Sequence, residues 1–286
     1  MVNQNLEKAT IETLVKNALQ EDDYDCDITT QYIIPNNTTG SFSLIAKEDG
    51  IVCGIDFLHA TFKHVSEDIT LHINKVDGET IRKNEVIGKI EGSLNKILAG
   101  ERVALNFLQM LSGIASLTNQ FIQILGNQSA IIIRDTRKTT PTLRSIEKYA
   151  VIKGGGQNHR NSLKDFILIK DNHLNWAMQT LSIKEIIQKY RQSTSSKYLI
   201  ELEVETIEQA KEAMQTDIDL LLLDNMSIEE IKKITDYNNN NNIKIEISGG
   251  INLNNISDYK NLDIDFIAIG AITHSAKFLD ISMELN

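Results

Sequence analysis

Basic residues are concentrated between Arg134 and Lys170. This stretch of 37 residues holds nine Lys/Arg and three Asp/Glu, a net charge of +6, although the whole chain carries −10. A nucleic-acid binder would spread its cations over a wide face, and the acidic total also argues against direct nucleic-acid binding. The stretch therefore indicates a site for a small anion that carries several charges.

Five side chains of the stretch are expected to reach one cavity: Arg137, Lys138, His159, Arg160 and Lys170. Arginine pairs bidentately with carboxylate or phosphate, while lysine acts as a mobile point charge. Because such a set repels itself, it needs a multiply charged ligand or facing acids. The Gly154–Gly156 run is interpreted as backbone that approaches the ligand and then presents His159 and Arg160. The remaining basic residues are interpreted as helix-face or structural charges: Arg134, Arg144, Lys148, Lys153 and Lys164.

Facing acids and an anion cradle follow later in the chain. Glu203 and Asp224 end two successive apolar runs and have the type to bind sugar hydroxyls or hydrated Mg²⁺. Ser248-Gly249-Gly250 and Gly270-Ala271 end the last two runs, where bared backbone N–H groups can hold a phosphate. His173, just after Lys170, is expected to support the site without touching the ligand.

These residues need a parallel sheet to bring them together. After residue 112, apolar runs begin at residues 131, 166, 198, 220, 243 and 265, most of them separated by amphipathic helical patterns. This alternation predicts βα units with six clear strands, and a seventh strand is expected around Tyr149–Ile152. Each run ends in a polar residue or a glycine, as at the rim of an α/β barrel enzyme. The Asn238–Asn242 run is interpreted as a loop insert without a function.

The first part of the chain has a different hydrophobic pattern. Helices are predicted at Leu6–Leu19 and Ile55–His64, and short antiparallel strands lie between Gly40 and Glu91. We therefore expect a small α+β sandwich domain over residues 1–112 and an α/β barrel over residues 113–274. Whether residues 275–286 pack back on the first domain is left open.

Composition and end segments suggest a cytoplasmic protein. The first residues lack the basic and apolar regions of a signal peptide, and no apolar run approaches the length of a membrane helix. The two cysteines, Cys26 and Cys53, are expected to be reduced thiols. No membrane and no nucleic-acid partner is expected.

Several longer motifs resemble one enzyme family. The segments ERVALNFLQMLSGIAS, DTRKTTP, KYAVIKGGGQNHR, LIKDNH, ELEVE, LLLDNM and SGGI resemble quinolinate phosphoribosyltransferase, the carboxylating nicotinate-nucleotide pyrophosphorylase, in the order of that family. The resemblance implies a sandwich domain joined to an open seven-stranded α/β barrel of the type II phosphoribosyltransferase kind. It also implies a homodimer with shared active sites, with further assembly to a hexamer left open.

The resemblance also implies a reaction. Phosphoribosyl would pass from 5-phosphoribosyl 1-diphosphate (PRPP) to quinolinate, giving nicotinate mononucleotide, diphosphate and CO2 with Mg²⁺. Substrate-binding roles are implied for residues of the cationic stretch, and for Arg102 reaching in from the partner subunit. The implied contacts to quinolinate and to both substrates' charges are made by Thr136, Arg137, Lys138, His159, Arg160 and Lys170.

The remaining implied roles concern the sugar phosphate. Glu203 and Asp224 would face the ribose hydroxyls and Mg²⁺, which the protein would hold indirectly through water or substrate. Catalysis is assigned to Lys138, Lys170, Glu203 and Asp224. The 5-phosphate would be cradled by Ser248, Gly249, Gly250, Gly270 and Ala271.

Two departures from the family pattern and three alternatives remain. Glycines usual in the family are replaced in EDDYDCDIT and by Thr142, which affects loop geometry and no predicted ligand. One alternative is the related pyrophosphorylase branch associated with molybdenum transport. Another is a Schiff-base barrel enzyme that uses Lys170 as nucleophile, and the third is a non-catalytic protein that binds phosphorylated sugars.

Overall fold

The computed structural model describes residues 6–126, 129–193, 198–238 and 243–286. The chain divides into two compact units. Unit 1 combines residues 1–119, 140–155 and 275–286, and unit 2 combines residues 120–139 and 156–274. The expected barrel range of 113–274 is thus interrupted, because residues 140–155 group with unit 1.

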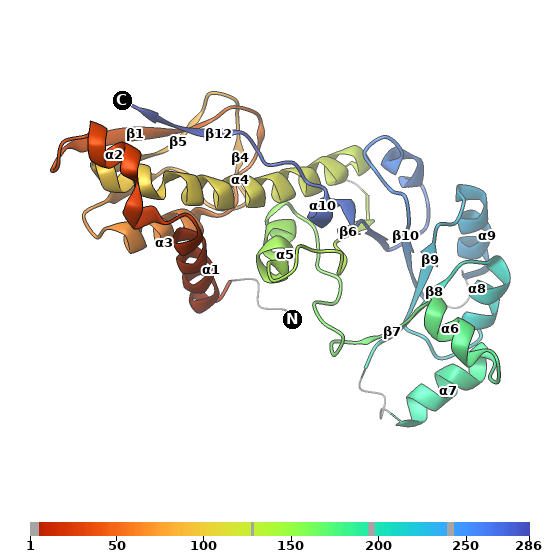
Figure 1. Ribbon diagram of the computed structural model, residues 1–286. Coiled ribbons are helices and arrows are strands. Elements are labelled where there is room, and N and C mark those ends of the chain that lie inside the picture. The colour runs from red at the N-terminus through yellow and green to blue at the C-terminus, as the bar shows by residue number, and fades with distance from the viewer. Residues whose placement is uncertain (1–5, 127–128, 194–197, 239–242) are drawn as a thin grey trace. The chain divides into compact units, whose positions relative to one another are not determined.

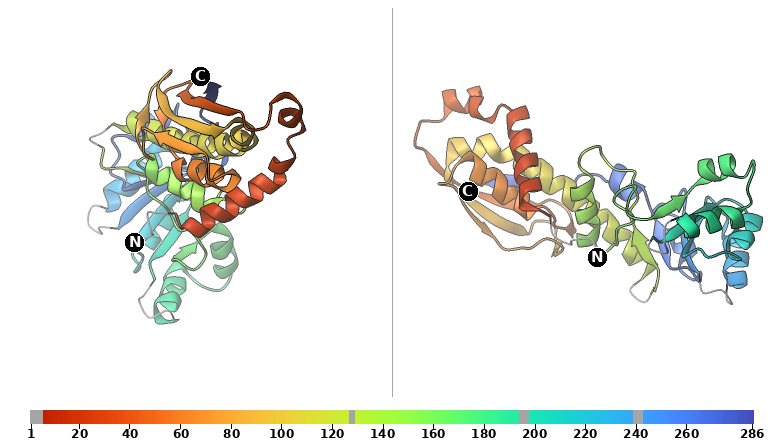
Figure 2. Two further views of the ribbon diagram at one scale, coloured as in Figure 1. Left: turned by 90° about the vertical axis from the view of Figure 1, so that its left-hand side faces the viewer. Right: turned by 90° about the horizontal axis from the view of Figure 1, so that it is seen from below.

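Unit 1 is built around an antiparallel sheet with the strand order β12-β1-β5-β3. Its strands are β1 (Thr39–Ala46), β3 (Thr70–Ile73), β5 (Val86–Ser93) and β12 (Ile281–Leu285). The short strands β2 (Gly50–Ile51) and β4 (Thr80–Ile81) pair separately. Strand β12 lies beside β1 with Ala46 opposite Ile281, so distant parts of the sequence complete one sheet (Figure 2).

Among the described residues, five helices lie wholly or mostly in unit 1, and all but the second, whose Ile28 and Ile33 are exposed, bury apolar side chains. They are α1 (Lys8–Glu21), α2 (Ile28–Ile33), α3 (Ile55–Val65), α4 (Leu94–Leu125) and α5 (Arg144–Lys153). Helix α1 packs on α3, and Phe57 of α3 stacks on Phe107 of α4 with ring centroids 4.7 Å apart. The helix α3 begins after Gly54, where the Asp77 carboxylate accepts hydrogen bonds from the backbone N–H groups of Gly54 and Ile55. That acceptor satisfies N–H groups that a helix start leaves unpaired.

The prediction of a strand at Tyr149–Ile152 is wrong, because these residues belong to helix α5. Four apolar residues in a row fit either a strand or the buried side of a helix, and here the helix buries Ile146, Ala150 and Val151. Gly154 follows the helix, and a side chain there would overlap the carbonyl oxygen of Ala115 on α4. The glycine run was expected to approach the ligand, but Gly154 approaches α4 instead. None of the three glycines lines the unit 2 cavity described below.

Unit 2 contains a six-stranded sheet with the order β6-β11-β10-β9-β8-β7, parallel throughout (Figure 1). Its strands are β6 (Ile132–Arg134), β7 (Ile167–Ile169), β8 (Ile200–Val204), β9 (Leu220–Asp224), β10 (Lys244–Ser248) and β11 (Phe266–Ala268). The strands coincide with the six predicted apolar runs. An isolated parallel bridge joins Arg134 to Gln157, so the backbone at Gln157 pairs with the end of β6.

Short helices follow the strands of unit 2. They are α6 (Asp171–Ala177), α7 (Ile183–Ser193), α8 (Ile207–Ala213), α9 (Ile228–Asn238) and α10 (Ala271–His274), with a 3₁₀ turn at Ile256–Tyr259. The α8 and α9 helices lie along one face of the sheet (Figure 1). Asn238 ends α9 and donates from Nδ2 to the Ile243 carbonyl at 2.6 Å, whereas the rest of the predicted asparagine insert lies outside the described residues.

Two further observations concern the whole described chain. Cys26 is exposed and Cys53 is buried, and neither is in a disulfide. Among the described residues, no helix combines the length and apolar composition that crossing a bilayer requires.

Candidate active site

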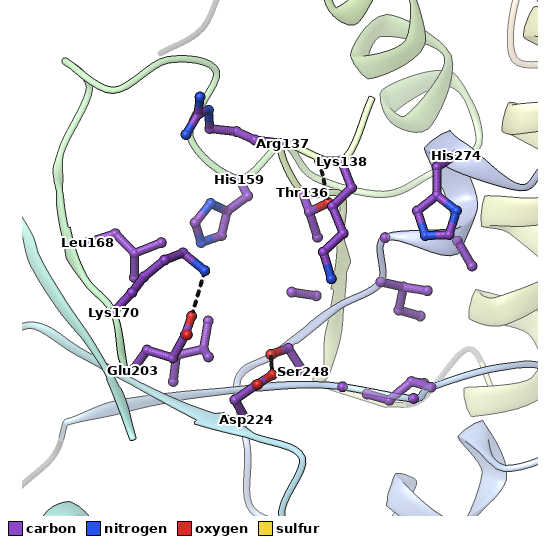
Figure 3. A pocket seen from close by; sticks show the side chains of 18 of the residues that line it. Thr136, Arg137, Lys138, His159, Leu168, Lys170, Glu203, Asp224, Ser248 and His274 are labelled. Atoms are coloured by element: carbon purple, nitrogen blue, oxygen red, sulfur yellow. Dashed lines mark hydrogen bonds and ion pairs between the residues drawn. The ribbon is translucent and has the colours of Figure 1, made fainter. Parts of the chain in front are cut away.

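A cavity of about 600 Å³ lies at the carboxyl ends of the unit 2 strands (Figure 3). It is lined by residues that the sequence singled out, namely Thr136, Arg137, Lys138, His159, Arg160, Lys170, Glu203, Asp224, Ser248, Gly249, Gly250, Gly270 and Ala271. Parallel strands bring their carboxyl ends to one edge, which explains why residues from six separate runs meet here.

The arginines of the cavity have donors without protein partners. The Nε atoms of Arg137 and Arg160 are buried and form no hydrogen bond within the described part of the chain. Burial, and next the charge of Arg137, hold the pKa of Arg160 below its usual value. Buried donors normally have partners, so two unpaired guanidinium N–H groups in one cavity indicate an anionic ligand.

Lysines enter the cavity from two strand ends. Lys138 is fixed through its backbone, since its N–H donates to Thr136 Oγ1 at 2.9 Å and its carbonyl accepts from Thr273 Oγ1 at 2.8 Å. Lys170 follows β7, and its Nζ lies 2.8 Å from Glu203 Oε2. His173 Nδ1 accepts the backbone N–H of Lys170 at 3.0 Å, and its expected supporting role stays a prediction.

The Asp224 carboxylate is held by neutral donors. Ser248 Oγ donates to its Oδ1, and Asn225 Nδ2 donates to its Oδ2 at 2.7 Å. Neither of these donors carries a positive charge, so neither neutralises the carboxylate, which can attract a cation or accept sugar hydroxyls. Glu203, by contrast, shares its charge with Lys170.

Glycines shape the opposite wall. Gly249 and Gly250 have φ angles of 98° and 62°, and a side chain at Gly249 would overlap the side chain of Asn225. Consecutive left-handed residues after a strand turn backbone N–H groups into a concave anion nest. No α-helix follows this turn directly, whereas Gly270 leads into the single-turn helix α10.

The sequence interpretation missed two sets of residues. His274, at the end of α10, lines the cavity next to Gly270, and its only signal is its position four residues after a strand-end glycine. Glu201 and Glu246 lie beneath the lining, completely buried. In the runs ELEVE and IEIS, acids at alternate positions were the available signal, but such alternation also fits a solvent-facing edge.

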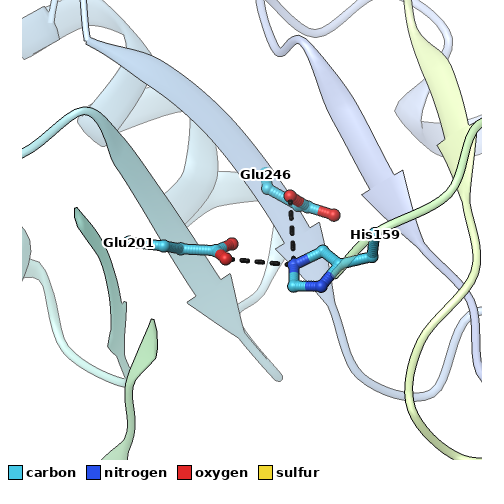
Figure 4. Close-up of side chains that lie close together, drawn as sticks. All are labelled: His159, Glu201 and Glu246. Carbon is cyan, nitrogen blue, oxygen red and sulfur yellow. Dashed lines mark hydrogen bonds and ion pairs between the residues drawn. The ribbon is translucent and has the colours of Figure 1, made fainter. Parts of the chain in front are cut away.

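The two buried glutamates meet at His159 (Figure 4), and Glu246 also contacts Arg134. His159 Nε2 is 3.0 Å from Glu201 Oε2 and 3.8 Å from Glu246 Oε2, and Arg134 Nη1 is 3.0 Å from Glu246 Oε2. Burial is the main cause that raises the pKa of both carboxyls to about 7, and the charge of Glu201 adds to the effect at Glu246.

Metal-ligand geometry occurs in this buried group. His159, Glu201 and Glu246 are the one set of three potential ligands found among the described residues, with ligand atoms within 4.8 Å of one another. Arg134 already supplies a positive charge at Glu246, so the group fits an internal charge cluster better than a metal site. Glu203 and Asp224 are not part of it.

Arg102 is the one predicted ligand that lies elsewhere. It belongs to unit 1, is exposed on α4, and lines a separate cavity of about 450 Å³ together with Asn106, Thr142 and Phe278. Its expected contribution to a neighbouring subunit's site stays a prediction.

The fold and the cavity define a class of protein. A parallel α/β sheet carries, at its carboxyl edge, a cationic pocket, two carboxylates and a glycine-rich anion nest. This combination is typical of α/β enzymes that act on phosphorylated sugars together with a second anion.

Comparison with known proteins identifies the family of the chain. The model for the quinolinate phosphoribosyl transferase N-terminal domain matches residues 27–112, and the model for its C-terminal domain matches residues 114–284. A probable nicotinate-nucleotide pyrophosphorylase [carboxylating] of Bacillus subtilis is 39% identical over 278 residues, covering 96% of this chain and 93% of the relative. The corresponding protein of Methanocaldococcus jannaschii is 38% identical, covering 95% and 96%.

The crystal structure of NadC from Streptococcus pyogenes is similar over 98% of this chain and 97% of that chain, with a TM-score of 0.91 and 39% identity. The chain belongs to the quinolinate phosphoribosyltransferase family.

Proposed function

We propose that this protein transfers the phosphoribosyl group of PRPP to quinolinate with decarboxylation, giving nicotinate mononucleotide, diphosphate and CO2, a step of NAD biosynthesis. The relatives' names describe this enzyme class. The observation that carries the proposal is the pair of buried Nε–H groups of Arg137 and Arg160 that have no hydrogen-bond partner among the described residues, in a cavity that also holds an anion nest. A dicarboxylate and a sugar phosphate would supply the charges that such a cavity lacks.

Quinolinate is assigned to the cationic side of the cavity. Arg137 and Arg160 would pair with its carboxylates, His159 would complete this wall, and Arg102 of a partner subunit would close the site in a homodimer. Lys138 and Lys170 would contact charges of both substrates. The pyridine nitrogen is itself a nucleophile, so the reaction needs no serine or cysteine activated by histidine.

PRPP is assigned to the opposite side. Its 5-phosphate would occupy the nest formed by Ser248, Gly249, Gly250, Gly270 and Ala271. Glu203 and Asp224 would face the ribose hydroxyls and stabilise the positive charge that develops at the anomeric carbon as diphosphate leaves. The carboxylates fit Mg²⁺ chemistry through water or substrate oxygens, and bound Mg²⁺ would neutralise charge on the departing diphosphate.

Decarboxylation follows from the same chemistry. When the ring nitrogen bonds to the ribose, it becomes quaternary, and the ring can accept the electron pair that the adjacent C–CO2 bond releases. A proton then replaces the carboxylate on the ring carbon. The protein's contribution is mainly the positioning of charges. Two unbonded cysteines fit a reducing compartment, so we place the enzyme in the cytoplasm.

The decisive experiment is to incubate the protein with quinolinate, PRPP and Mg²⁺ and to measure nicotinate mononucleotide, diphosphate and CO2. We expect all three in equal amounts, and a turnover lower by orders of magnitude when Lys138→Ala replaces the wild type. A non-catalytic binding protein would bind PRPP without releasing diphosphate. A member of the branch associated with molybdenum transport would leave quinolinate unchanged, and either result would refute the proposal.

A further inference from the structure

A layer of charge lies directly beneath the cavity lining. Glu201 precedes Glu203 by two residues on β8, and Glu246 precedes Ser248 by two residues on β10. Side chains two apart on a strand share a face, so each buried glutamate sits one layer below a residue that lines the cavity. The two carboxylates come from strands on either side of β9.

Contacts of the glutamates are concentrated on one oxygen each. Glu201 Oε2 contacts His159 Nε2, and Glu246 Oε2 contacts both His159 Nε2 and Arg134 Nη1. The Oε1 atoms of both glutamates are buried without a hydrogen-bond partner in the described residues. The imidazole of His159 is therefore where both carboxylates converge.

His159 is held from other directions as well. Its backbone N–H donates to Asp135 Oδ1 at 2.9 Å, and its ring meets the Phe166 ring edge-on with centroids 5.2 Å apart. These contacts fix the main chain and one side of the ring. The two glutamates fix the position of Nε2, which leaves the imidazole one orientation in the cavity wall.

Stability alone does not account for two acids at these positions. A buried carboxylate is costly even when it is paired, and apolar residues of similar volume often serve stability better. On the intervening strand, Leu222 is paired in register with Glu246 and also lines the cavity. An apolar side chain is thus accommodated next to the acid.

We propose that Glu201 and Glu246 are positioning residues for His159, whose Nε2–H donates to the Glu201 carboxylate while the Glu246 carboxylate lies 3.8 Å from the same nitrogen. This contact keeps Nε2 protonated and sets the imidazole in the cavity wall. The consequence for quinolinate rests on the function proposed above, whereas the state of the imidazole does not. Because the Nε2 proton is directed at the buried carboxylate, the remainder of the ring faces the cavity, and the glutamates determine how it is presented there.

The effect on ligand affinity distinguishes this role from a simple charge effect. If the glutamates acted only as negative charges beneath an anion site, their neutralisation would tighten quinolinate binding. If they position His159, neutralisation releases the imidazole and weakens binding. Glu201→Gln keeps the shape and removes the charge, so the direction of change decides between the two.

The first test needs no substrate. In protein labelled with ¹⁵N-histidine, the ring signals of His159 are assigned by their loss in His159→Gln, since the chain has six histidines. We expect a protonated Nε2 in the wild type at pH 7 and a shifted Nε2 signal in Glu201→Gln and in Glu246→Gln. An unprotonated Nε2 in the wild type, or unchanged signals in both variants, would overturn the proposal.

The second test measures quinolinate binding by calorimetry without PRPP. We expect Glu201→Gln to weaken binding roughly 10-fold, as the loss of a charge-assisted contact does. Since the glutamate acts through His159, the double variant Glu201→Gln/His159→Gln should bind no more weakly than His159→Gln alone. Additive losses, or tighter binding by Glu201→Gln, contradict the positioning role.

A folding control completes the design. Ile247 on β10 is buried and adjoins Glu246, but its side chain points to the other face of the strand. Ile247→Val should lower the melting temperature while leaving the His159 signals and quinolinate affinity unchanged. A wild-type protein that forms no nicotinate mononucleotide refutes the proposed function, and the His159 signals then still test the positioning role.

Discussion

Lys170 Nζ and Glu203 Oε2 lie 2.8 Å apart at the ends of two adjacent strands of the parallel sheet. The glutamate side chain is only 11% exposed, whereas that of the lysine is 45% exposed. The acid is therefore the fixed partner, and the lysine is free to follow a ligand.

For Glu203→Gln we expect a loss of roughly 10- to 150-fold in kcat/KM, because a charge-assisted contact is worth about 1.5–3 kcal/mol. The loss should fall mainly on kcat if the carboxylate acts on the developing positive charge. Steady-state kinetics with both substrates would measure it. Glu205→Gln, at an exposed position after the same strand, is the matched control and should keep full activity. Unchanged kinetics in Glu203→Gln would remove this residue from the catalytic set.

A substitution of Lys170 distinguishes a phosphoribosyltransferase from an enzyme that forms a Schiff base. Lys170→Arg keeps a positive charge but cannot form a Schiff base, so a phosphoribosyltransferase should retain measurable turnover. Borohydride treatment of the wild type with its substrates should give no adduct by mass spectrometry. Complete loss of turnover in Lys170→Arg together with a trapped adduct would instead establish the Schiff-base alternative.

Shared sites predict complementation between inactive variants. Arg102→Ala and Lys138→Ala should each lower turnover by orders of magnitude, because each removes a cation assigned to the substrates. If Arg102 acts in the partner's site, a mixed dimer contains one site with both residues intact. Mixing the two variants under subunit exchange should therefore restore part of the activity. No recovery, despite proven exchange, would place both residues in one subunit's site.

The Thr142 backbone is strained. Its φ angle is 70°, a left-handed conformation that is unfavourable for a β-branched residue. Thr142→Gly should raise the free energy of unfolding by about 1 kcal/mol, and Thr142→Asn by less, because both residues tolerate this conformation better. Urea denaturation would measure the gain. Thr142→Val keeps the branching and should gain nothing, so equal gains in all three variants would exclude backbone strain as the cause.

Stability should fall as pH rises across the range in which Glu246 titrates. Its pKa is about 7 in the folded protein and 4.5 in the reference state, so the folded protein binds more protons between these values. Folding is therefore favoured below this window and loses stability as pH rises through it. Glu201, Arg134 and His159 face the same carboxyl.

Glu246→Gln removes this titration. Between pH 5 and pH 8 the variant should lose less stability than the wild type, by roughly 1–3 kcal/mol. Urea denaturation at several pH values would show the difference, with the exposed Glu229→Gln as control. Parallel pH profiles for the wild type and Glu246→Gln would mean that this carboxyl titrates normally.

The strand ends were predictable from the sequence because local patterns determine them. A continuous apolar run followed by Lys170, Glu203 or Asp224 predicts a buried parallel strand and a functional rim, and the cavity lining contains all three. The failure at Tyr149–Ile152 arose because a four-residue apolar run carries no period of its own. Helix formation there depends on the packing of α5 in unit 1.

The charge cluster beneath the cavity was not predictable in this way. Alternating acids in a strand suggest exposure, yet Glu201 and Glu246 are completely buried on the face that also carries the cavity lining, and their partner His159 comes from a loop. Only the three-dimensional arrangement brings these groups together. Thr142 is different, because its departure from the family's glycine pattern was visible in the sequence and only its φ angle came from the structure.

The pairing of β12 with β1 has a consequence for synthesis on the ribosome. Ala46 and Ile281 are paired, so the two partners lie 235 positions apart in the sequence (281 − 46). At about 5–20 residues per second, β1 waits on the order of tens of seconds for its neighbour. During that interval its outer edge offers unpaired N–H and C=O groups to any passing strand. A nascent chain of this protein thus has a period of vulnerability to aggregation that the finished fold no longer reveals.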